Sequence, residues 1–164
     1  MLRKQIINAE NVAAIRRAEQ KGEEKNIAAL ATVFVTSEDP DHPIDFAFDA
    51  EEGPGASRWI AGAPGPQTVI LAFDVPQAIR KVRLEVEERD TSRTQEVDLA
   101  VSDDGGRTYR FVLRQEYNFS PPGTTLEREE WPFTANGVTH VRLRIKPDKG
   151  ERPCRATLTS FGVS

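Results

Sequence analysis

The chain is 164 residues long and carries a formal net charge of −4 at pH 7. A chain of this length buries roughly 70% of its unfolded surface, so it needs neither a disulfide nor a structural metal to fold. Its single cysteine, Cys154, excludes an internal disulfide and a multi-cysteine zinc site. The acidic balance argues against nucleic acid as a ligand, and no apolar run is long enough for a membrane span. The first residues lack the apolar core and cleavage site of a signal peptide, which predicts a cytoplasmic protein.

Residues 8–25 are predicted to form an N-terminal α-helix. The segment is rich in Ala, Glu, Arg, Lys and Gln, which favour helices; Asn8 suits the N-cap, and Gly22 weakens the far end. Its apolar stripe is thin, so we expect the helix to lie on the domain surface or to contact a partner, including a second copy of the chain. We therefore divide the protein into a helical arm, residues 1–25, and a main domain, residues 26–164.

After a strand predicted at residues 32–35 and a long loop-like region, the sequence pattern from residue 68 onward is almost wholly that of β-strands. The central feature is a hairpin, because residues 97–101 and 109–113 both alternate apolar and polar side chains, and Asp and Gly residues between them supply the turn. Residues 115–119 continue the second arm of this hairpin, and further strands are predicted over residues 32–35, 68–73, 82–86, 124–131, 141–145 and 155–163. Closely spaced strands with Pro- and Gly-rich turns predict an antiparallel sandwich or barrel.

Several short motifs occur in a definite order along residues 26–164. They are Asn26-Ile27-Ala28, Thr36-Ser37-Glu38, His42-Pro43, Ala47-Phe48-Asp49, Ser57-Arg58-Trp59, and a strand that ends in Ser-x-Asp-Gly at residues 102–105. In this order they resemble the discoidin domains (coagulation factor 5/8 type C domains), which belong to the galactose-binding-like jelly rolls. The resemblance implies an all-β fold, an antiparallel eight-stranded jelly-roll sandwich, preceded here by the N-terminal α-helix.

The same resemblance implies a structural calcium ion. Many members of the family hold one near the aspartate that matches Asp49, where Glu52 and Ser57 would add the oxygen ligands that calcium prefers. Calcium-binding members usually add a glutamate near the C-terminus, and this chain has Ser160 in the matching stretch. Calcium held by Asp49, Glu52 and Ser57 is therefore an expectation that rests on the resemblance alone.

Loops at one end of these jelly rolls hold ligands, and two residues match ligand-binding positions of sugar-binding members. His42 lies in the first long loop, and Arg93 lies just before the central hairpin, where a guanidinium would suit hydroxyls or carboxylates. Each residue also has an interpretation in which it binds no ligand. In that case His42 is simply a turn residue before Pro43, and Arg93 is a loop residue paired with Glu88 or Glu96. The sequence leaves these alternatives open.

The end of the hairpin's second arm offers a further candidate site. Tyr117 and Asn118, beside Arg114, combine a flat apolar ring with hydrogen-bonding groups for sugar hydroxyls. The alternative is that Tyr117 extends the buried face of Phe111 and Leu113, with which it shares the two-residue period of a strand.

Taken together, these features predict a non-catalytic binding module with a carbohydrate ligand. The sequence has no Gly-x-Ser-x-Gly motif, no phosphate-binding loop and no histidine spacing typical of a metal enzyme, which argues against an enzyme. The alternative is a protein–protein interaction or assembly domain on the same fold, with the N-terminal helix as part of the contact. The expected partner is therefore a glycan or a protein.

Overall fold

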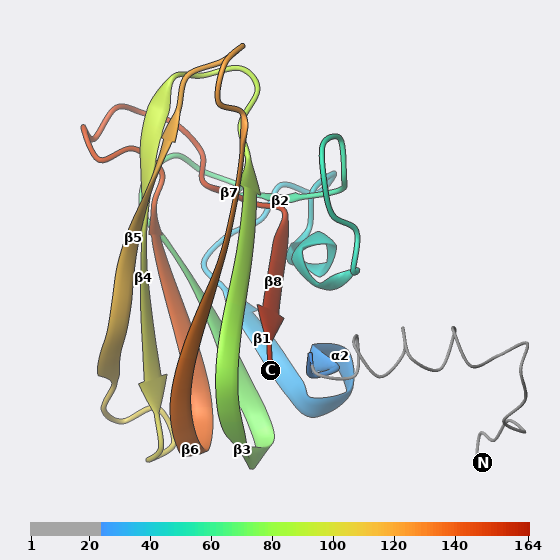
Figure 1. The fold of residues 1–164 in the computed structure, drawn as a ribbon, viewed down its shortest axis with the longest axis vertical. Helices are drawn as coiled ribbons and strands as arrows, with labels where there is room; N and C mark the ends of the chain where they lie inside the picture. Colours follow the sequence, from blue (N-terminus) through green and yellow to red (C-terminus); the bar gives the residue numbers. More distant parts are fainter. Residues whose placement is uncertain (1–23) are drawn as a thin grey trace, which may run out of the picture.

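The computed structural model describes residues 24–164, in which two β-layers pack against each other (Figure 1). In chain order the elements are α2 (Ile27–Leu30), β1 (Ala31–Val35), the 3-10 helix η1 (Ile44–Phe48), β2 (Trp59–Ile60), β3 (Gln67–Glu87), β4 (Arg93–Ser102), β5 (Arg110–Phe119), β6 (Leu126–Lys146), β7 (Thr157–Leu158) and β8 (Ser160–Val163). Neither of the helices in this part of the chain has the length and apolarity to cross a membrane.

The helix expected over residues 8–25, with the partner contact expected of it, lies outside the described residues except for its last two. Glu24 and Lys25 are not helical. The backbone N–H of Lys25 donates to the carbonyl of Val163 at 2.7 Å, so this stretch already contacts the last strand of the domain. Asn26 then caps α2, because its Oδ1 accepts from the backbone N–H of Ala29.

Two layers face each other, and the long strands β3 and β6 contribute to both. The five-stranded layer contains β1, residues 67–73 of β3, residues 140–146 of β6, β4 and β5, paired in that order. The three-stranded layer contains β8, residues 81–87 of β3 and residues 126–132 of β6. β2 and β7 form a separate pair. All pairs are antiparallel, which confirms the predicted jelly-roll sandwich, with five and three strand segments in its layers.

The sequence predicts separate strands where the structure has the single strand β3. The register of β3 against β6 shifts between Ala72 and Lys81, and Pro76 lies in this irregular stretch, where it has no paired partner. Proline is tolerated at such irregularities because no ladder hydrogen bond needs its missing N–H. The break between the two predicted strands is therefore a bend within one strand, which carries the chain from one layer to the other.

The predicted hairpin is present as β4 and β5, with one irregularity that changes its faces. Leu99 pairs with Leu113, but Ala100 pairs with Phe111, so the register shifts by one residue there. This β-bulge turns Phe111 outward, where it is 60% exposed, although its two-residue spacing from Leu113 predicts burial. The two-residue period holds only as long as the pairing is regular.

Apolar side chains fill the space between the layers. The fully buried members include Val69, Leu71, Val97, Leu99, Val141 and Leu143 from the five-stranded layer and Val82, Leu84 and Val86 from the three-stranded layer. Trp59 belongs to the same cluster and is completely buried, with its Nε1 donating to the carbonyl of Ser37 at 3.1 Å. Burial of each large apolar side chain contributes about 1.5–3 kcal/mol, so this cluster is the main source of stability.

The second half of β3 is buried on both faces, whereas its alternating pattern predicts one solvated face. Arg83, Glu85 and Glu87 point away from the core and are nonetheless almost fully buried. The loop before β2 covers them: the backbone N–H groups of Gly53 and Gly55 donate to the carboxylates of Glu85 and Glu87, each at 3.0 Å. Buried carboxylates need such donors, and the sequence pattern alone does not reveal that a loop supplies them.

Candidate functional site

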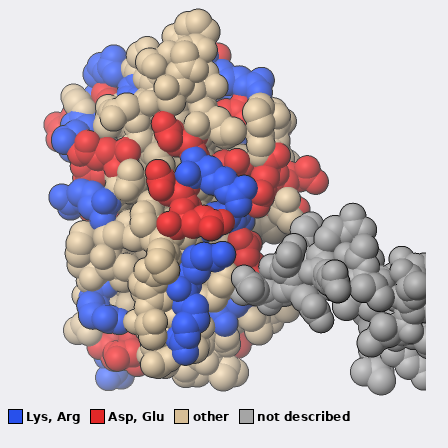
Figure 2. Space-filling model, viewed as in Figure 1, with Lys and Arg blue, Asp and Glu red and all other residues tan. Residues whose placement is uncertain are grey.

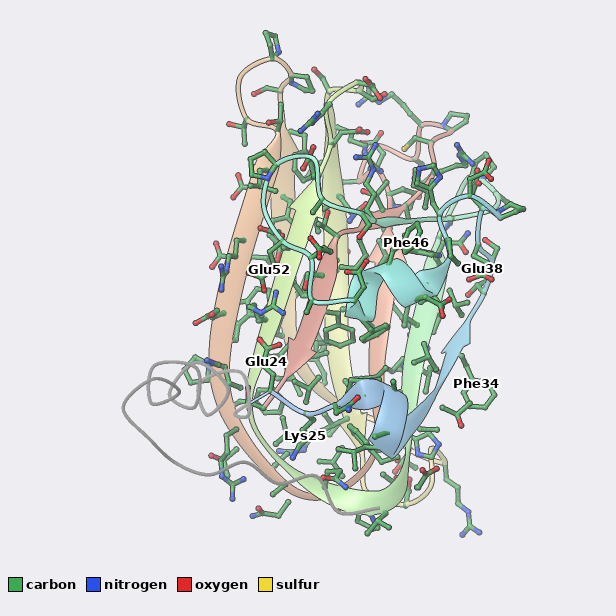
Figure 3. The ribbon with its side chains drawn as sticks, turned by 90° about the vertical axis from the view of Figure 1, so that its right-hand side faces the viewer. Glu24, Lys25, Phe34, Glu38, Phe46 and Glu52 are labelled. Atoms are coloured by element: carbon green, nitrogen blue, oxygen red, sulfur yellow. The ribbon has the colours of Figure 1, made fainter. Side chains whose placement is uncertain are left out.

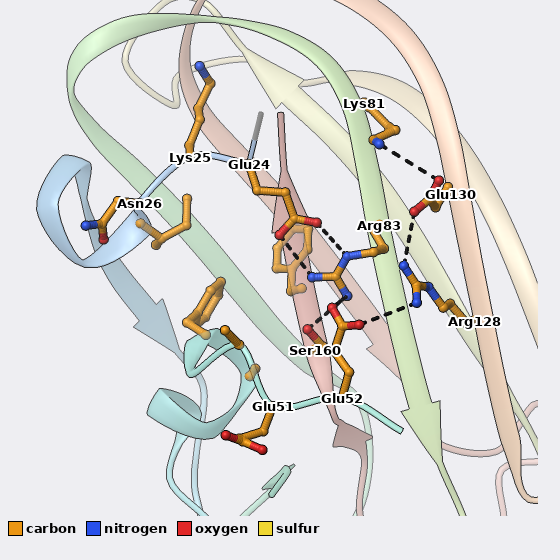
Figure 4. Close-up of a pocket in the computed structure, with 15 residues that line it drawn as sticks. Glu24, Lys25, Asn26, Glu51, Glu52, Lys81, Arg83, Arg128, Glu130 and Ser160 are labelled. Atoms are coloured by element: carbon orange, nitrogen blue, oxygen red, sulfur yellow. Dashed lines mark hydrogen bonds and ion pairs between the residues drawn. The ribbon is translucent and has the colours of Figure 1, made fainter. Parts of the chain in front are cut away.

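A cavity of about 860 Å³ lies between the outer side of the three-stranded layer, η1 and residues 24–27 (Figure 4). Acidic and basic side chains gather over this layer (Figure 2). Arg83, which is 4% exposed, lies at the centre, with Nε 2.6 Å from Glu24 Oε1 and Nη1 3.2 Å from Glu52 Oε1. Arg128 then links Glu52, at 3.4 Å, to Glu130, at 3.3 Å. The charges neutralise one another, and the ion pairs of Arg83 hold Glu24 and the loop that contains Glu52 against β3.

A glycine makes room for this cluster. Gly162 pairs with Arg83 across the sheet, and a Cβ at Gly162 would lie only 2.5 Å from Glu24 Oε1. The missing side chain therefore lets the Glu24 carboxylate lie over β8 and reach the guanidinium. The hydrogen bond from Arg83 lowers the pKa of Glu24 below its ordinary value. Figure 3 shows Glu24 and Lys25 beside this side of the sandwich.

A partly exposed polar cluster lies in the loops that follow β1 and precede β7. Arg155 Nη1 donates to Asp39 Oδ2 at 2.7 Å, and His42 Nδ1 lies 3.7 Å from Asp39 Oδ1. A β-bridge between Asp39 and His42, and a hydrogen bond from the N–H of Asp41 to Asp39 Oδ1, hold the first loop in place. The side chains of His42 and Arg155 are 39% and 44% exposed. This loop cluster can therefore present both donors and acceptors to a ligand.

Electrostatics keeps the carboxylate of the loop cluster ionised. The hydrogen bond from Arg155 is the largest cause that lowers the pKa of Asp39, so this side chain remains an acceptor at neutral pH. The sequence analysis predicted His42 as a site residue but predicted neither Asp39 nor Arg155. Asp39 and Arg155 are 116 residues apart, and only the fold brings them together.

Arg93 is buried, and its guanidinium is used within the protein. Nη1 donates to the carbonyls of Pro147 and Arg155, at 2.9 and 3.0 Å, and Nη2 donates to Thr157 Oγ1 at 3.2 Å. Nε lies 2.9 Å from Glu88 Oε1, which is the pairing that the sequence left open as the alternative. This arrangement gives Arg93 a structural role, because its side chain is only 1% exposed and each guanidinium nitrogen already lies close to an oxygen of the protein.

The three candidates on β5 are split between two faces. Tyr117 is 1% exposed and packs beside Phe119, as its alternative interpretation expects, and burial raises the pKa of its hydroxyl. Arg114 and Asn118 are exposed on the outer face of the five-stranded layer. Arg114 Nε donates to Asp98 Oδ1 at 2.6 Å, and Asn118 Oδ1 accepts from Thr94 Oγ1 at 2.7 Å. The structure therefore does not assemble Arg114, Tyr117 and Asn118 into one site.

The expected calcium ligands do not converge either. Asp49 and Ser57 are hydrogen-bonded to each other, whereas Glu52 points into the charged cavity and pairs with Arg83 and Arg128. Nowhere in residues 24–164 do three His, Cys, Asp or Glu side chains gather as a metal site requires. The residues present do not fit the calcium site that the family resemblance implies.

We therefore expect millimolar calcium to leave the melting temperature of the full chain unchanged. A resident ion would stabilise the folded state in proportion to the logarithm of its concentration. The measurement is thermal unfolding in calcium, in magnesium and in chelator. A rise that is specific to calcium and reversed by chelation would show that Asp49 and Glu52 rearrange around an ion.

No protein-family model matches the chain, and no curated protein matches its sequence. Several solved structures match its fold. CpGH89CBM32-5 from Clostridium perfringens, solved with GalNAc-β-1,3-galactose, is 22% identical with a TM-score of 0.56, over 85% of this chain and 98% of that one. A chitosan-binding module from a Paenibacillus chitosanase/glucanase is also 22% identical, with a TM-score of 0.58 over 85% and 98%. CBM32-3 from a Clostridium perfringens glycoside hydrolase is 14% identical, with a TM-score of 0.61 over 87% and 95%.

The chain has the jelly-roll fold of these solved structures. The resemblance drawn from the short motifs is thereby confirmed at the level of the fold. Within this jelly roll, the loop cluster of Asp39, His42 and Arg155 is the candidate site that combines polar groups with partial exposure.

Proposed function

We propose that this protein is a non-catalytic carbohydrate-binding module whose ligand binds at the loop cluster. The observation that carries the proposal is the convergence of an imidazole, an ionised carboxylate and a guanidinium at Asp39, His42 and Arg155. Sugar hydroxyls both donate and accept hydrogen bonds, so a mixed set of donors and acceptors suits them. Similar jelly rolls solved with galactosides, and one that binds chitosan, support a glycan ligand.

Each residue of the loop cluster has a distinct part in this proposal. Asp39 accepts a hydrogen bond from a sugar hydroxyl, and Arg155 donates one while it holds the carboxylate in place. The imidazole of His42 adds a ring nitrogen and a flat face. Arg93 helps to position Arg155, because its guanidinium donates a hydrogen bond to the backbone carbonyl of Arg155.

The proposal is tested by a glycan array followed by calorimetry with the best ligand. His42→Ala should weaken binding about tenfold, the equivalent of one hydrogen bond of roughly 1.4 kcal/mol. His140→Ala is the matched control, because the chain has two histidines and His140 lies on β6, hydrogen-bonded to Thr139. Binding of no glycan by the wild type would overturn the proposal, and an equal loss in both variants would remove the site from the loop cluster.

A further inference from the structure

The outer face of the five-stranded layer carries a row of residues that runs straight across it. Phe34 of β1 pairs with Ile70 of β3, Ile70 with Arg142 of β6, Arg142 with Ala100 of β4, and Ala100 with Phe111 of β5. Phe34 and Phe111, at the two ends, are 57% and 60% exposed. Figure 3 shows Phe34 pointing away from the sandwich. We call these residues the outer row.

An arginine without a carboxylate partner occupies the middle of the outer row. The guanidinium of Arg142 lies over the ring of Tyr109, 4.0 Å from its centroid, and its Nε is buried without a hydrogen-bond partner among the described residues. Burial and the neighbouring Arg144 lower the pKa of Arg142. A cation of this kind is available for an anionic group.

Arg144, two residues further along β6, also lacks a carboxylate partner among the described residues. Its neighbour across the sheet is Asp98, but both carboxylate oxygens of Asp98 are occupied by Arg114, at 2.6 and 3.1 Å. Within residues 24–164, neither Arg142 nor Arg144 forms an ion pair. The protein therefore places Arg142 between two exposed aromatic rings, with Arg144 two residues further along the same face of β6.

We propose that the outer row, together with Arg144 beside it on β6, binds an acidic polysaccharide, with sugar carboxylates on Arg142 and Arg144 and sugar rings on Phe34 and Phe111. This inference rests on the proposed function. It adds a second binding face and specifies that the ligand of this face is anionic. A guanidinium matches a carboxylate with two parallel hydrogen bonds. An aromatic ring offers an apolar face to the C–H groups of a sugar.

The dimensions of the outer row favour a polymer. Neighbouring strands lie about 4.8 Å apart, so the four spacings from Phe34 to Phe111 span about 19 Å. A single sugar covers only part of that distance. A chain that crosses the strands would contact both rings and both cations at once.

The test uses polygalacturonate and its fully methyl-esterified form, which differ in the charge of the carboxyl groups. Binding to the full-length protein is measured by calorimetry and affinity electrophoresis. The wild type should bind polygalacturonate at least tenfold more tightly than the ester. The double variant R142Q/R144Q should lose at least tenfold in affinity for polygalacturonate, and Phe111→Ser should weaken binding of both polymers.

Matched controls separate this face from general effects. Arg128→Gln removes a charge from the opposite layer and Val75→Ser removes an exposed apolar side chain elsewhere, and both should bind as the wild type does. If R142Q/R144Q fails to fold by circular dichroism, the single variant Arg144→Gln carries the test, because its side chain is exposed.

Two outcomes would overturn the proposal. Polygalacturonate binding that persists in R142Q/R144Q, or equal binding of polyglutamate through the same arginines, would show that the outer row is not a site for acidic sugars. If neutral glycans bind through His42 while polygalacturonate does not bind, this inference fails and the proposed function stands. If no glycan of either kind binds, both fail.

Discussion

Replacing Arg93 with methionine is expected to lower the free energy of unfolding by about 3–5 kcal/mol. The Arg93 side chain is 1% exposed, donates to two backbone carbonyls and lies 2.9 Å from the largely buried carboxylate of Glu88. Methionine fills similar space but donates no hydrogen bond, so the carbonyls and the carboxylate would remain buried without their partner. Urea unfolding followed by circular dichroism at neutral pH measures the loss.

Arg114→Met is the matched control for this experiment. Arg114 also pairs with a carboxylate, but its side chain is 56% exposed, so water screens the pair and its removal should leave the free energy of unfolding almost unchanged. An Arg93→Met variant with wild-type stability would contradict the structural role. If that stable variant also lost glycan binding, Arg93 would be a ligand-binding residue, as the family resemblance implies.

The double variant E24Q/E52Q is expected to cost about 3–5 kcal/mol, because it leaves the buried charge of Arg83 without a carboxylate. Each single substitution should cost less, since the remaining glutamate still pairs with the guanidinium. Arg83→Met should cost less than the double variant as well, because the two freed glutamates are partly exposed and can be hydrated. Glu51→Gln, at an exposed residue of the same cavity, is the control.

The pH dependence of this cluster has a definite sign. Because Arg83 lowers the folded-state pKa of Glu24 below the ordinary value of 4.5, the stability from this pair is fully present above pH 4.5. It is lost as the pH falls through the lowered pKa. The difference between wild type and Glu24→Gln should therefore shrink in acid, which unfolding midpoints from neutral pH downward would show. A difference that stays constant over this range would contradict the ion pair.

Much of the strand pattern could be predicted from local alternation. The hairpin of β4 and β5 and the inward face of Val82, Leu84 and Val86 follow from the two-residue period and the turn residues. The same period failed at Phe111, because a bulge shifts the register, and at Arg83, because a loop covers the outer face of the strand. Both failures depend on partners that are distant in the sequence.

The candidate site was predictable only in part. His42 has a local signal, since it lies in a turn-rich loop and matches a position of the family, but Arg155, which pairs with the neighbouring Asp39, is 116 residues from that aspartate. Arg93 is an arginine, and a guanidinium group is well suited to bind hydroxyls or carboxylates. Its burial, which decides its role, depends on the loop before β7 folding over it.

The fold class and most of the strands can be predicted from local patterns, because apolar periodicity and turn chemistry act between residues that are neighbours in the chain. Which polar side chains remain accessible depends on contacts between distant segments. Arg93, Glu85 and Arg83 are buried by segments far away in the sequence, whereas Arg144 has no ion pair among the described residues because its neighbour Asp98 pairs with Arg114. Charge compensation depends on three-dimensional distance, and composition does not contain that information.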